Sequence, residues 1–207
     1  MKTGKLISFE GIEGVGKTTT INFIKQYLEK NNIKVYCTRE PGGTKFGESI
    51  RNILLNNKSV ISPEAELLTL FSIRNQHIKE IIVPKLNEGY WVLCDRFIDA
   101  SYAYQGYGKK VSLNKIKMLV DNFTEDITPE LTIFFDLSYN LAKKRFPKNK
   151  VKDRFENLDN NFFEDVYSGY VKIASSNKSR IKIIDATQDK ISVQNDIITE
   201  IIKKFKL

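Results

Sequence analysis

The stretch from Gly11 to Thr18, Gly-Ile-Glu-Gly-Val-Gly-Lys-Thr, limits the possible folds of this chain more than any other. It follows a short apolar run at residues 6–10 that is typical of a buried strand, and it precedes residues 19–30, where apolar residues recur at helical spacing. A strand, a glycine-rich loop and a helix in this order bind phosphate, because backbone N–H groups and the helix N-terminus hold phosphate oxygens. The motif therefore predicts binding of ATP or GTP.

Two side chains of this motif have a chemical role of their own. Lys17 would place its ammonium group on the β- and γ-phosphates, and Thr18 would offer its hydroxyl to Mg²⁺. A glycine turn without a ligand is the alternative, and the flanking strand and helix argue against it. The predicted nucleotide-binding residues are Gly11, Ile12, Glu13, Gly14, Val15, Gly16, Lys17 and Thr18.

Length and composition favour a soluble α/β protein with one domain. A chain of 207 residues can bury a sizeable core, and 41% hydrophobic with 28% charged residues is typical of globular proteins. No apolar run approaches the roughly 20 residues that cross a bilayer. Glu10 interrupts the N-terminal apolar run too early for a signal peptide. We interpret Cys37 and Cys94 as core residues in a reducing compartment, and expect a cytoplasmic protein.

The net charge of +8 does not by itself indicate nucleic-acid binding. Most basic residues are lysines scattered along the chain, whereas a nucleic-acid surface would cluster them. The charge supports only a weak attraction for polyanions such as nucleotides. Because arginine is rare here, its seven positions are informative, since a planar guanidinium binds phosphate with two bonds where lysine cannot.

Alternating strand and helix signals predict a five-stranded parallel sheet with helices on both faces, as in phosphate-loop NTPases. The predicted strands are 6–10, 33–38, 91–95, 131–137 and 181–185. The predicted helices are 19–30, 46–54, 63–87, 112–123, 139–145, 155–175 and 191–205, the third with a bend at Pro84. Neither a helix nor a strand is predicted for the polar and aromatic residues 99–107.

Two residues at the end of the third strand are candidates for the chemistry. Ligands of parallel sheets bind at the carboxyl ends of the strands, so Asp95 is placed to hold Mg²⁺ directly or through water. The alternative is a surface carboxylate that caps the next element. Arg96 could bridge two phosphate groups and offset the charge that develops during transfer. The alternative interpretation of Arg96 is a surface ion pair with Asp99 or Glu40.

Four blocks in this order resemble the thymidylate kinase family: residues 11–18, 38–44 (Thr-Arg-Glu-Pro-Gly-Gly-Thr), 95–101 (Asp-Arg-Phe-Ile-Asp-Ala-Ser) and 103–106 (Ala-Tyr-Gln-Gly). The resemblance spans nearly the whole chain. It implies the reaction ATP + dTMP → ADP + dTDP with Mg²⁺, on a homodimer, without nucleic-acid or membrane partners. It also implies a single nucleoside monophosphate kinase domain over 1–207, with a short lid at about 145–155.

The resemblance also implies contacts to the acceptor nucleotide. Arg51 and Arg96 would bind the phosphate of dTMP, and Arg74 would bond to thymine O4. Ser101 and Gln105 would help to hold the base. The chemistry agrees, because thymine offers two carbonyl acceptors and one N–H, which arginine and glutamine side chains can match.

Departures from the family pattern leave two points open. The family usually has an aromatic residue four positions before the base-binding arginine. Here that position is Leu70, and Phe71 follows one position later. One helical step is a rotation of about 100°, so only one of the two can face the base.

Glu13 matches the family's loop carboxylate, which contacts the acceptor sugar or the magnesium shell. The alternative is a loop carboxylate that stays in solvent.

The predicted lid is the second departure. It has Arg145 and Arg154 at its ends and lysines between them, and Asn149 stands where a middle arginine is frequent. We expect Arg145 or Arg154 to contact the transferring phosphoryl group, and the lysine-rich segment to be mobile without nucleotides. The open functional alternatives are a kinase for another nucleoside monophosphate, or a switch or partition ATPase.

Overall fold

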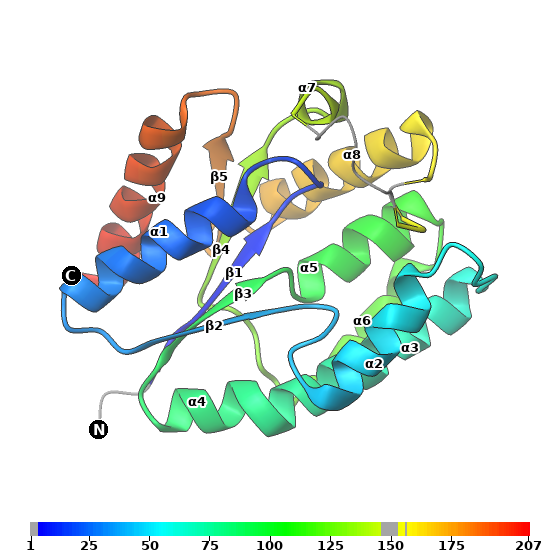
Figure 1. Cartoon of the computed structure of the whole chain (residues 1–207), viewed down its shortest axis with the longest axis horizontal. Helices are drawn as coiled ribbons and strands as arrows, with labels where there is room; N and C mark the ends of the chain where they lie inside the picture. Colours follow the sequence, from blue (N-terminus) through cyan, green and yellow to red (C-terminus); the bar gives the residue numbers. More distant parts are fainter. Residues whose placement is uncertain (1–3, 146–152, 156) are drawn as a thin grey trace.

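Five parallel strands form the centre of the structure, in the order β2-β3-β1-β4-β5 (Figure 1). The strands are β1 (Leu6–Glu10), β2 (Val35–Arg39), β3 (Trp91–Asp95), β4 (Leu131–Asp136) and β5 (Ile181–Asp185). The computed structural model describes residues 4–145, 153–155 and 157–207. The predicted α/β fold with a five-stranded parallel sheet is confirmed.

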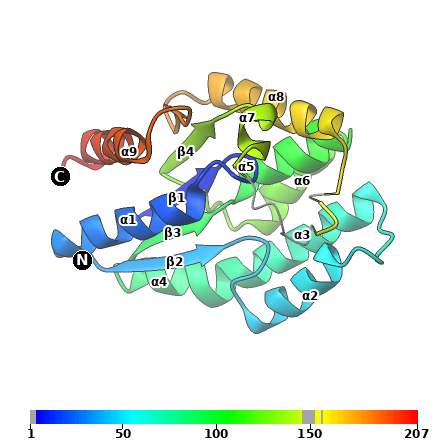
Figure 2. The same cartoon turned by 45° about the horizontal axis from the view of Figure 1, so that its top comes forward.

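Helices cover both faces of the sheet. On one face lie α1 (Lys17–Lys30) and α9 (Lys190–Phe205); on the other lie α4 (Val83–Asn87), α5 (Ile98–Ser101) and α8 (Asn160–Ser176) (Figure 1). Figure 2 shows α2 (Lys45–Leu55) beside α3 (Pro63–His77), past the carboxyl end of β2. The remaining helices are η1 (Ile78–Ile82), η2 (Tyr102–Gly108), α6 (Leu113–Phe123) and α7 (Tyr139–Lys143).

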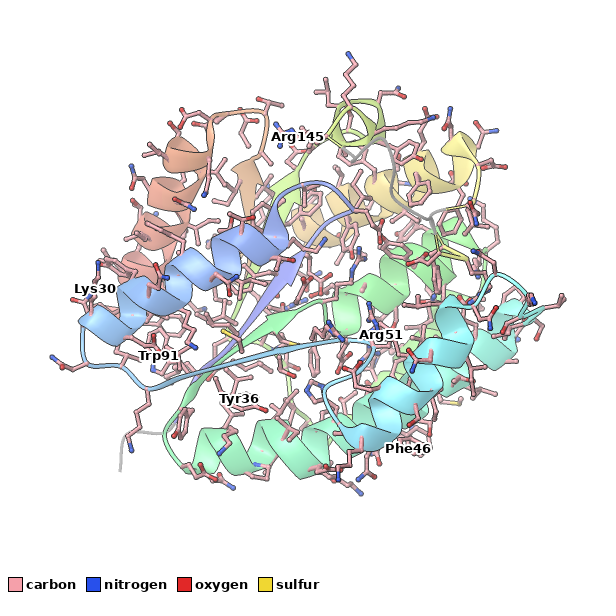
Figure 3. The ribbon with its side chains drawn as sticks, in the orientation of Figure 1. Lys30, Tyr36, Phe46, Arg51, Trp91 and Arg145 are labelled. Atoms are coloured by element: carbon pink, nitrogen blue, oxygen red, sulfur yellow. The ribbon has the colours of Figure 1, made fainter. Side chains whose placement is uncertain are left out.

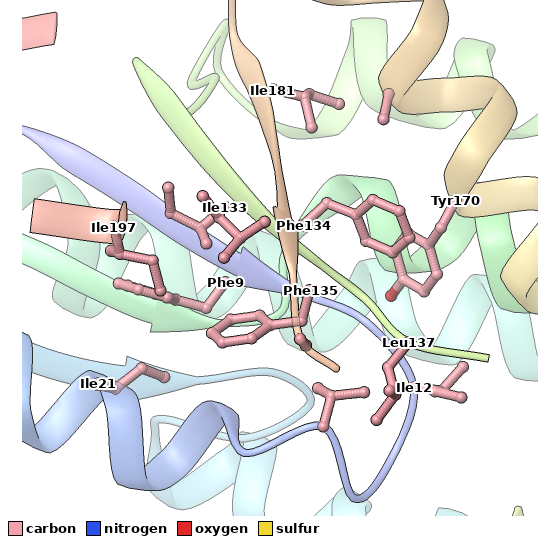
Figure 4. Packing of buried hydrophobic residues seen from close by; sticks show 14 of the residues in the cluster. Phe9, Ile12, Ile21, Ile133, Phe134, Phe135, Leu137, Tyr170, Ile181 and Ile197 are labelled. Carbon is pink, nitrogen blue, oxygen red and sulfur yellow. The ribbon is translucent and has the colours of Figure 1, made fainter. Parts of the chain in front are cut away.

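The central strands are buried on both faces, and their side chains alternate between two packing layers. Ile21 of α1 and Ile197 of α9 belong to the same core cluster as Phe9 and Phe135 (Figure 4). Phe134, the neighbour of Phe135 in β4, stacks on Tyr170 of α8 with ring centroids 5.3 Å apart. This alternation follows from the period of two along a strand.

The predicted long helix before β3 is present as three consecutive segments, α3, η1 and α4. Near Pro84, where the bend was predicted, the π-helical segment η1 ends at Ile82, two residues before the proline. In its wider turn the Val83 N–H donates to the Ile78 carbonyl. Such a turn accommodates the missing N–H and the ring of a proline inside a helix.

Two predicted boundaries were wrong. Residues 99–107, left without an element, are helical as α5 and η2, because α8 covers them and their backbone groups pair internally. The helix expected to begin at Phe155 begins at Asn160, where the Asp159 side chain accepts from the Phe162 N–H. Phe155 instead lies before the helix and lines a cleft that is described below as the central cleft.

The predicted lid lies mostly outside the described residues, so its expected mobility stays a prediction. Residues 145 and 153–155 of the predicted lid belong to the described part of the chain. No helix in the described part of the chain has the length and apolar character needed to cross a membrane.

A close contact between α8 and η2 gives a test of the fold. A Cβ atom on Gly169 would lie 2.7 Å from the Tyr107 ring. We therefore expect Gly169→Ala to overpack this interface and destabilise the protein by about 1–3 kcal/mol, which lowers Tm by several degrees. The control is Ser168→Ala on the exposed side of the same helix. Equal melting temperatures for the two variants would contradict this packing.

Candidate active site

The phosphate loop runs from β1 into α1 with a backbone that glycine allows. Gly11, Gly14 and Gly16 have φ angles of 142°, 81° and 97°, a region that other residues rarely adopt. Gly16 precedes the first residue of α1, so the free N–H groups of that helix face the loop. Ile12 and Val15 are buried and attach the loop to the core.

Lys17 is held inside this loop. Its Nζ donates to the Gly11 and Ile12 carbonyls, both at 3.0 Å, and the residue is only 8% exposed. Burial lowers the pKa of the ammonium to about 8, and the positive charge of Arg96 acts in the same direction. Nearby carboxylates, Asp95 and Glu13, oppose that shift. The lysine therefore lies where an anionic ligand would stabilise its charge.

A cleft at the carboxyl ends of β2 and β3, named here the central cleft, brings together most of the residues predicted to bind the acceptor nucleotide. Elements far apart in sequence contribute to its wall: the phosphate loop, α2, α3, β3, α5 and η2. Of the predicted site residues, those that line it are Glu13, Arg51, Leu70, Arg74, Asp95, Arg96, Ser101 and Gln105.

Arg96 lies against the phosphate loop. Its Nη2 donates to Glu13 Oε1 at 2.7 Å, and its guanidinium lies 4.6 Å from the centre of the Tyr104 ring. Tyr104 in turn donates its phenol O–H to Glu13 Oε2 at 2.9 Å. Burial would raise the pKa of Glu13, but Arg96 and Lys17 hold it below its usual value. The Glu13 carboxylate, 24% exposed, thus links the phosphate loop to Arg96 and Tyr104 of the cleft.

Arg74 is buried and its orientation is fixed by three hydrogen bonds. Nε donates to Glu40 Oε2 at 2.7 Å, while the two terminal nitrogens donate to Ser101 Oγ and to the Phe97 carbonyl, each at 3.0 Å. Glu40 also contacts His77 Nδ1 at 3.1 Å. Burial would raise the pKa of Glu40, but Arg74 and His77 hold it below its usual value.

A second buried carboxylate, Glu66, orients the far wall of the cleft. Gln105 Nε2 donates to Glu66 Oε1 at 2.9 Å, and Lys109 Nζ donates to Oε2 at 2.6 Å. Arg154 Nη2 also donates to Glu66 Oε2. Glu66 therefore links α3, the end of η2 and the C-terminal end of the predicted lid.

Arg51 and Leu70 also line the central cleft. Arg51 Nη1 donates to the Pro41 carbonyl at 2.6 Å. Leu70 lines the cleft, whereas Phe71 lies in a separate apolar cluster with Leu67, and its ring packs 4.6 Å from the Arg74 guanidinium carbon. Only Leu70 of this pair has its side chain at the cleft.

The two predicted metal ligands line one hollow beside the phosphate loop. Thr18 and Asp95 both contribute to its wall, together with Arg51. Asp95 Oδ1 is buried without a hydrogen-bond partner among the described residues. Buried carboxylate oxygens normally have partners, so this atom has capacity for a ligand.

The two lid arginines lie apart. Arg145 Nη2 donates to the Ala186 carbonyl at 2.9 Å, next to the end of β5, and Figure 3 shows it well separated from Arg51 on α2. Arg154 Nε donates to the Leu54 carbonyl at 2.7 Å, and its other nitrogen bonds to Glu66. Neither lines the central cleft.

Three residues that organise the site are not among the predicted site residues: Glu40, Glu66 and Tyr104. Glu40 and Tyr104 stand inside the quoted sequence blocks, so their position in those blocks was the available signal. Glu66 lies in the first turn of α3, and nothing in one sequence pairs it with Gln105.

Together, a parallel sheet of this order, a phosphate loop after β1 and an arginine-lined cleft beside it define a phosphate-loop kinase. Comparison with known proteins specifies the family. A sequence model of the Thymidylate kinase family matches residues 9–197. The chain belongs to the thymidylate kinase family, and its activity is the phosphorylation of dTMP to dTDP.

Individual relatives match over nearly their full length. The chain is 47% identical to thymidylate kinase from Vesicomyosocius okutanii, over 91% of this chain and 92% of the relative. It is 44% identical to that of Methylococcus capsulatus, over 97% and 96%. The crystal structure of thymidylate kinase from Ehrlichia chaffeensis superposes with a TM-score of 0.77 at 32% identity, over 96% of this chain and 99% of the other.

The Lys17 environment gives a pH-dependent prediction. Only the ammonium form attracts phosphate, and its pKa of about 8 lies within the range of assay. As pH rises from 7.5 to 9.5, we expect the Kd for ATP to increase toward tenfold per pH unit, because binding then requires uptake of a proton. Calorimetric titration measures this. Lys17→Arg keeps its charge over the range and should show no such slope. A constant Kd for the unchanged chain would refute the titration of Lys17.

Proposed function

We propose that this chain transfers the γ-phosphoryl group of ATP directly to dTMP, with Mg²⁺, and that the central cleft binds dTMP. The observation that carries this proposal is the position of Arg51, Arg74, Arg96 and Gln105 in one cleft that also includes Glu13 of the phosphate loop. Lys17 binds the donor phosphates at the loop, and the cleft holds the acceptor at the same rim of the sheet. Positioning and charge stabilisation then supply most of the catalysis.

Arg51 and Arg96 bind the acceptor phosphate. Both line the cleft on the side of the phosphate loop, and both present guanidinium groups that can form two parallel bonds to phosphate oxygens. Arg96 bonds to Glu13, and Glu13 also interacts with Lys17. We therefore assign Arg96 to the phosphoryl group during its transfer, when charge develops on that group. Glu13 acts by holding Arg96 and Tyr104 in place.

Arg74, Ser101 and Gln105 hold the base. Arg74 keeps two N–H donors beyond the three it gives to protein partners, enough for a carbonyl oxygen. We propose that Leu70 packs on thymine, since its side chain lines the cleft and that of Phe71 belongs to another cluster. Phe71 supports the base indirectly, through its contact with the Arg74 guanidinium.

Asp95 and Thr18 are suited to hold Mg²⁺. The hard cation prefers oxygen ligands, and these two residues offer a carboxylate with an unpaired buried oxygen and a hydroxyl at the same hollow. When bound, Mg²⁺ would neutralise charge on the β- and γ-phosphates. Arg145 or Arg154 is proposed to contact the transferring phosphoryl group when the lid closes, and the closed lid would exclude water from the transfer.

We also propose a homodimer formed by α2, α3 and α6. Large apolar side chains are exposed on these three helices, which a partner copy would cover. They are Phe46 and Ile53 on α2, Leu68 on α3, and Leu113, Met118 and Phe123 on α6. A single domain over 1–207 and a cytoplasmic location complete the proposal, the latter supported by free Cys37 and Cys94.

The assignment of Arg96 is tested by Arg96→Lys. An ammonium cannot replace two parallel guanidinium bonds, so we expect kcat to fall about 100-fold or more while KM for dTMP changes less. A loss confined to KM would mean that Arg96 binds ground state and transition state equally. Arg180→Lys is the control: Arg180 forms a two-bonded pair with Asp99 outside the cleft, so its loss should lower Tm and leave kcat nearly unchanged.

The metal assignment is tested by Asp95→Asn. Removing the carboxylate charge should raise the Mg²⁺ concentration for half-maximal rate by about 10- to 100-fold. The matched control is Asp136→Asn at the end of β4, where Oδ1 accepts from the Tyr167 phenol. If both variants need the same Mg²⁺ concentration as the unchanged chain, Asp95 does not act on the metal.

A further inference from the structure

The amide of Gln105 has one orientation in this fold, and a buried carboxylate sets it. Glu66 is fully buried, and its Oε1 lies 2.9 Å from Gln105 Nε2. Gln105 is itself 2% exposed and lines the central cleft. A glutamine amide can turn by 180° and exchange its donor and acceptor ends, so a neighbour must decide which end faces a ligand.

Glu66 can fix the orientation of the Gln105 amide because a carboxylate only accepts hydrogen bonds. Two cations, Lys109 and Arg154, form ion pairs with its Oε2, so that oxygen also accepts hydrogen bonds. An ionised carboxylate has no proton to donate, so the Gln105 atom beside Oε1 must be the NH₂ group. The Gln105 carbonyl oxygen then points the other way, and it has no hydrogen-bond partner among the described residues.

The cleft therefore presents a donor and an acceptor, each fixed by its own carboxylate. Arg74 is the donor, held by Glu40. Gln105 Oε1 is the acceptor, held by Glu66. Thymine carries a carbonyl at C4 and an N–H at N3, which match this pair. Cytosine carries an NH₂ group at C4 and a bare nitrogen at N3, so donor would meet donor and acceptor would meet acceptor.

We propose that Glu66 is a specificity-determining residue: by fixing the Gln105 amide, it makes the cleft accept thymine or uracil and reject cytosine. This inference rests on the proposed contact between Gln105 and the base. Glu66 touches no substrate and acts through Gln105, so it is a positioning residue. A merely structural role, linking α3 to η2 and to Arg154, would loosen the whole cleft and would not favour cytosine in particular.

The test is Glu66→Gln, compared by kcat/KM for dTMP, dUMP and dCMP. A glutamine at 66 can donate as well as accept, so the Gln105 amide can turn and present its NH₂ group to the base. We expect the dTMP/dCMP ratio to fall by about 10- to 100-fold, since a site that matches hydrogen bonds rejects a mismatch strongly. The dTMP/dUMP ratio should not change, because the two bases differ only in a methyl group remote from this edge.

Two further variants separate a positioning role from a structural one. Lys109→Met removes a cation from Glu66 but leaves the carboxylate, so it should lower Tm and preserve the dTMP/dCMP ratio. Gln105→Met removes the amide, and in that background Glu66→Gln should cause no further loss of discrimination. An additional loss there, or a change in the dTMP/dUMP ratio of Glu66→Gln, would overturn the inference.

The proposed base contact can fail separately. If Gln105→Met leaves the dTMP/dCMP ratio unchanged, Gln105 does not contact the base and the assignment of the base site is wrong. If Gln105→Met lowers the ratio while Glu66→Gln does not, the base contact stands and only the role of Glu66 is refuted.

Discussion

Three carboxylates, of which Glu40 and Glu66 are buried, hold the polar side chains of this cleft in position, and the geometry of the site depends on them. Glu13 holds Arg96, Glu40 holds Arg74, and Glu66 holds Gln105. A guanidinium removed from water needs a partner of opposite charge, because isolated burial of a charge is very unfavourable. The partner also selects one side-chain direction, so the pairing that permits burial fixes the orientation in which a ligand is met.

The sheet explains why these pairs can form at all. In a parallel sheet every strand ends at the same edge, and each connection begins there. The phosphate loop follows β1, Glu40 follows β2, and Arg96 follows β3. Since β1 and β2 both neighbour β3, the three connections meet at one place. The Glu13–Arg96 bond joins two of them directly.

Helical irregularity supplies the other side of the cleft. The η2 segment carries Tyr104 and Gln105 in a wide π-helical turn, and Tyr104 bonds to Glu13 while Gln105 bonds to Glu66. Segments of this kind are rare and recur at functional sites, because the extra residue per turn changes where side chains point. The close packing of α8 on η2 at Gly169 keeps this turn in place.

The sequence by itself determined the local features of this protein. The phosphate loop, the five strands and most helix boundaries follow from glycine chemistry and apolar periodicity, which act over neighbouring residues. The motif blocks also indicated the family, and thereby a kinase of dTMP. Tertiary structure decided what depends on contacts across the chain: that Leu70 and not Phe71 lines the cleft, that Arg145 and Arg154 lie apart, and that Glu66 orients Gln105. Those contacts join residues up to 100 positions apart, as between Arg154 and Leu54, and no local pattern records such a pairing.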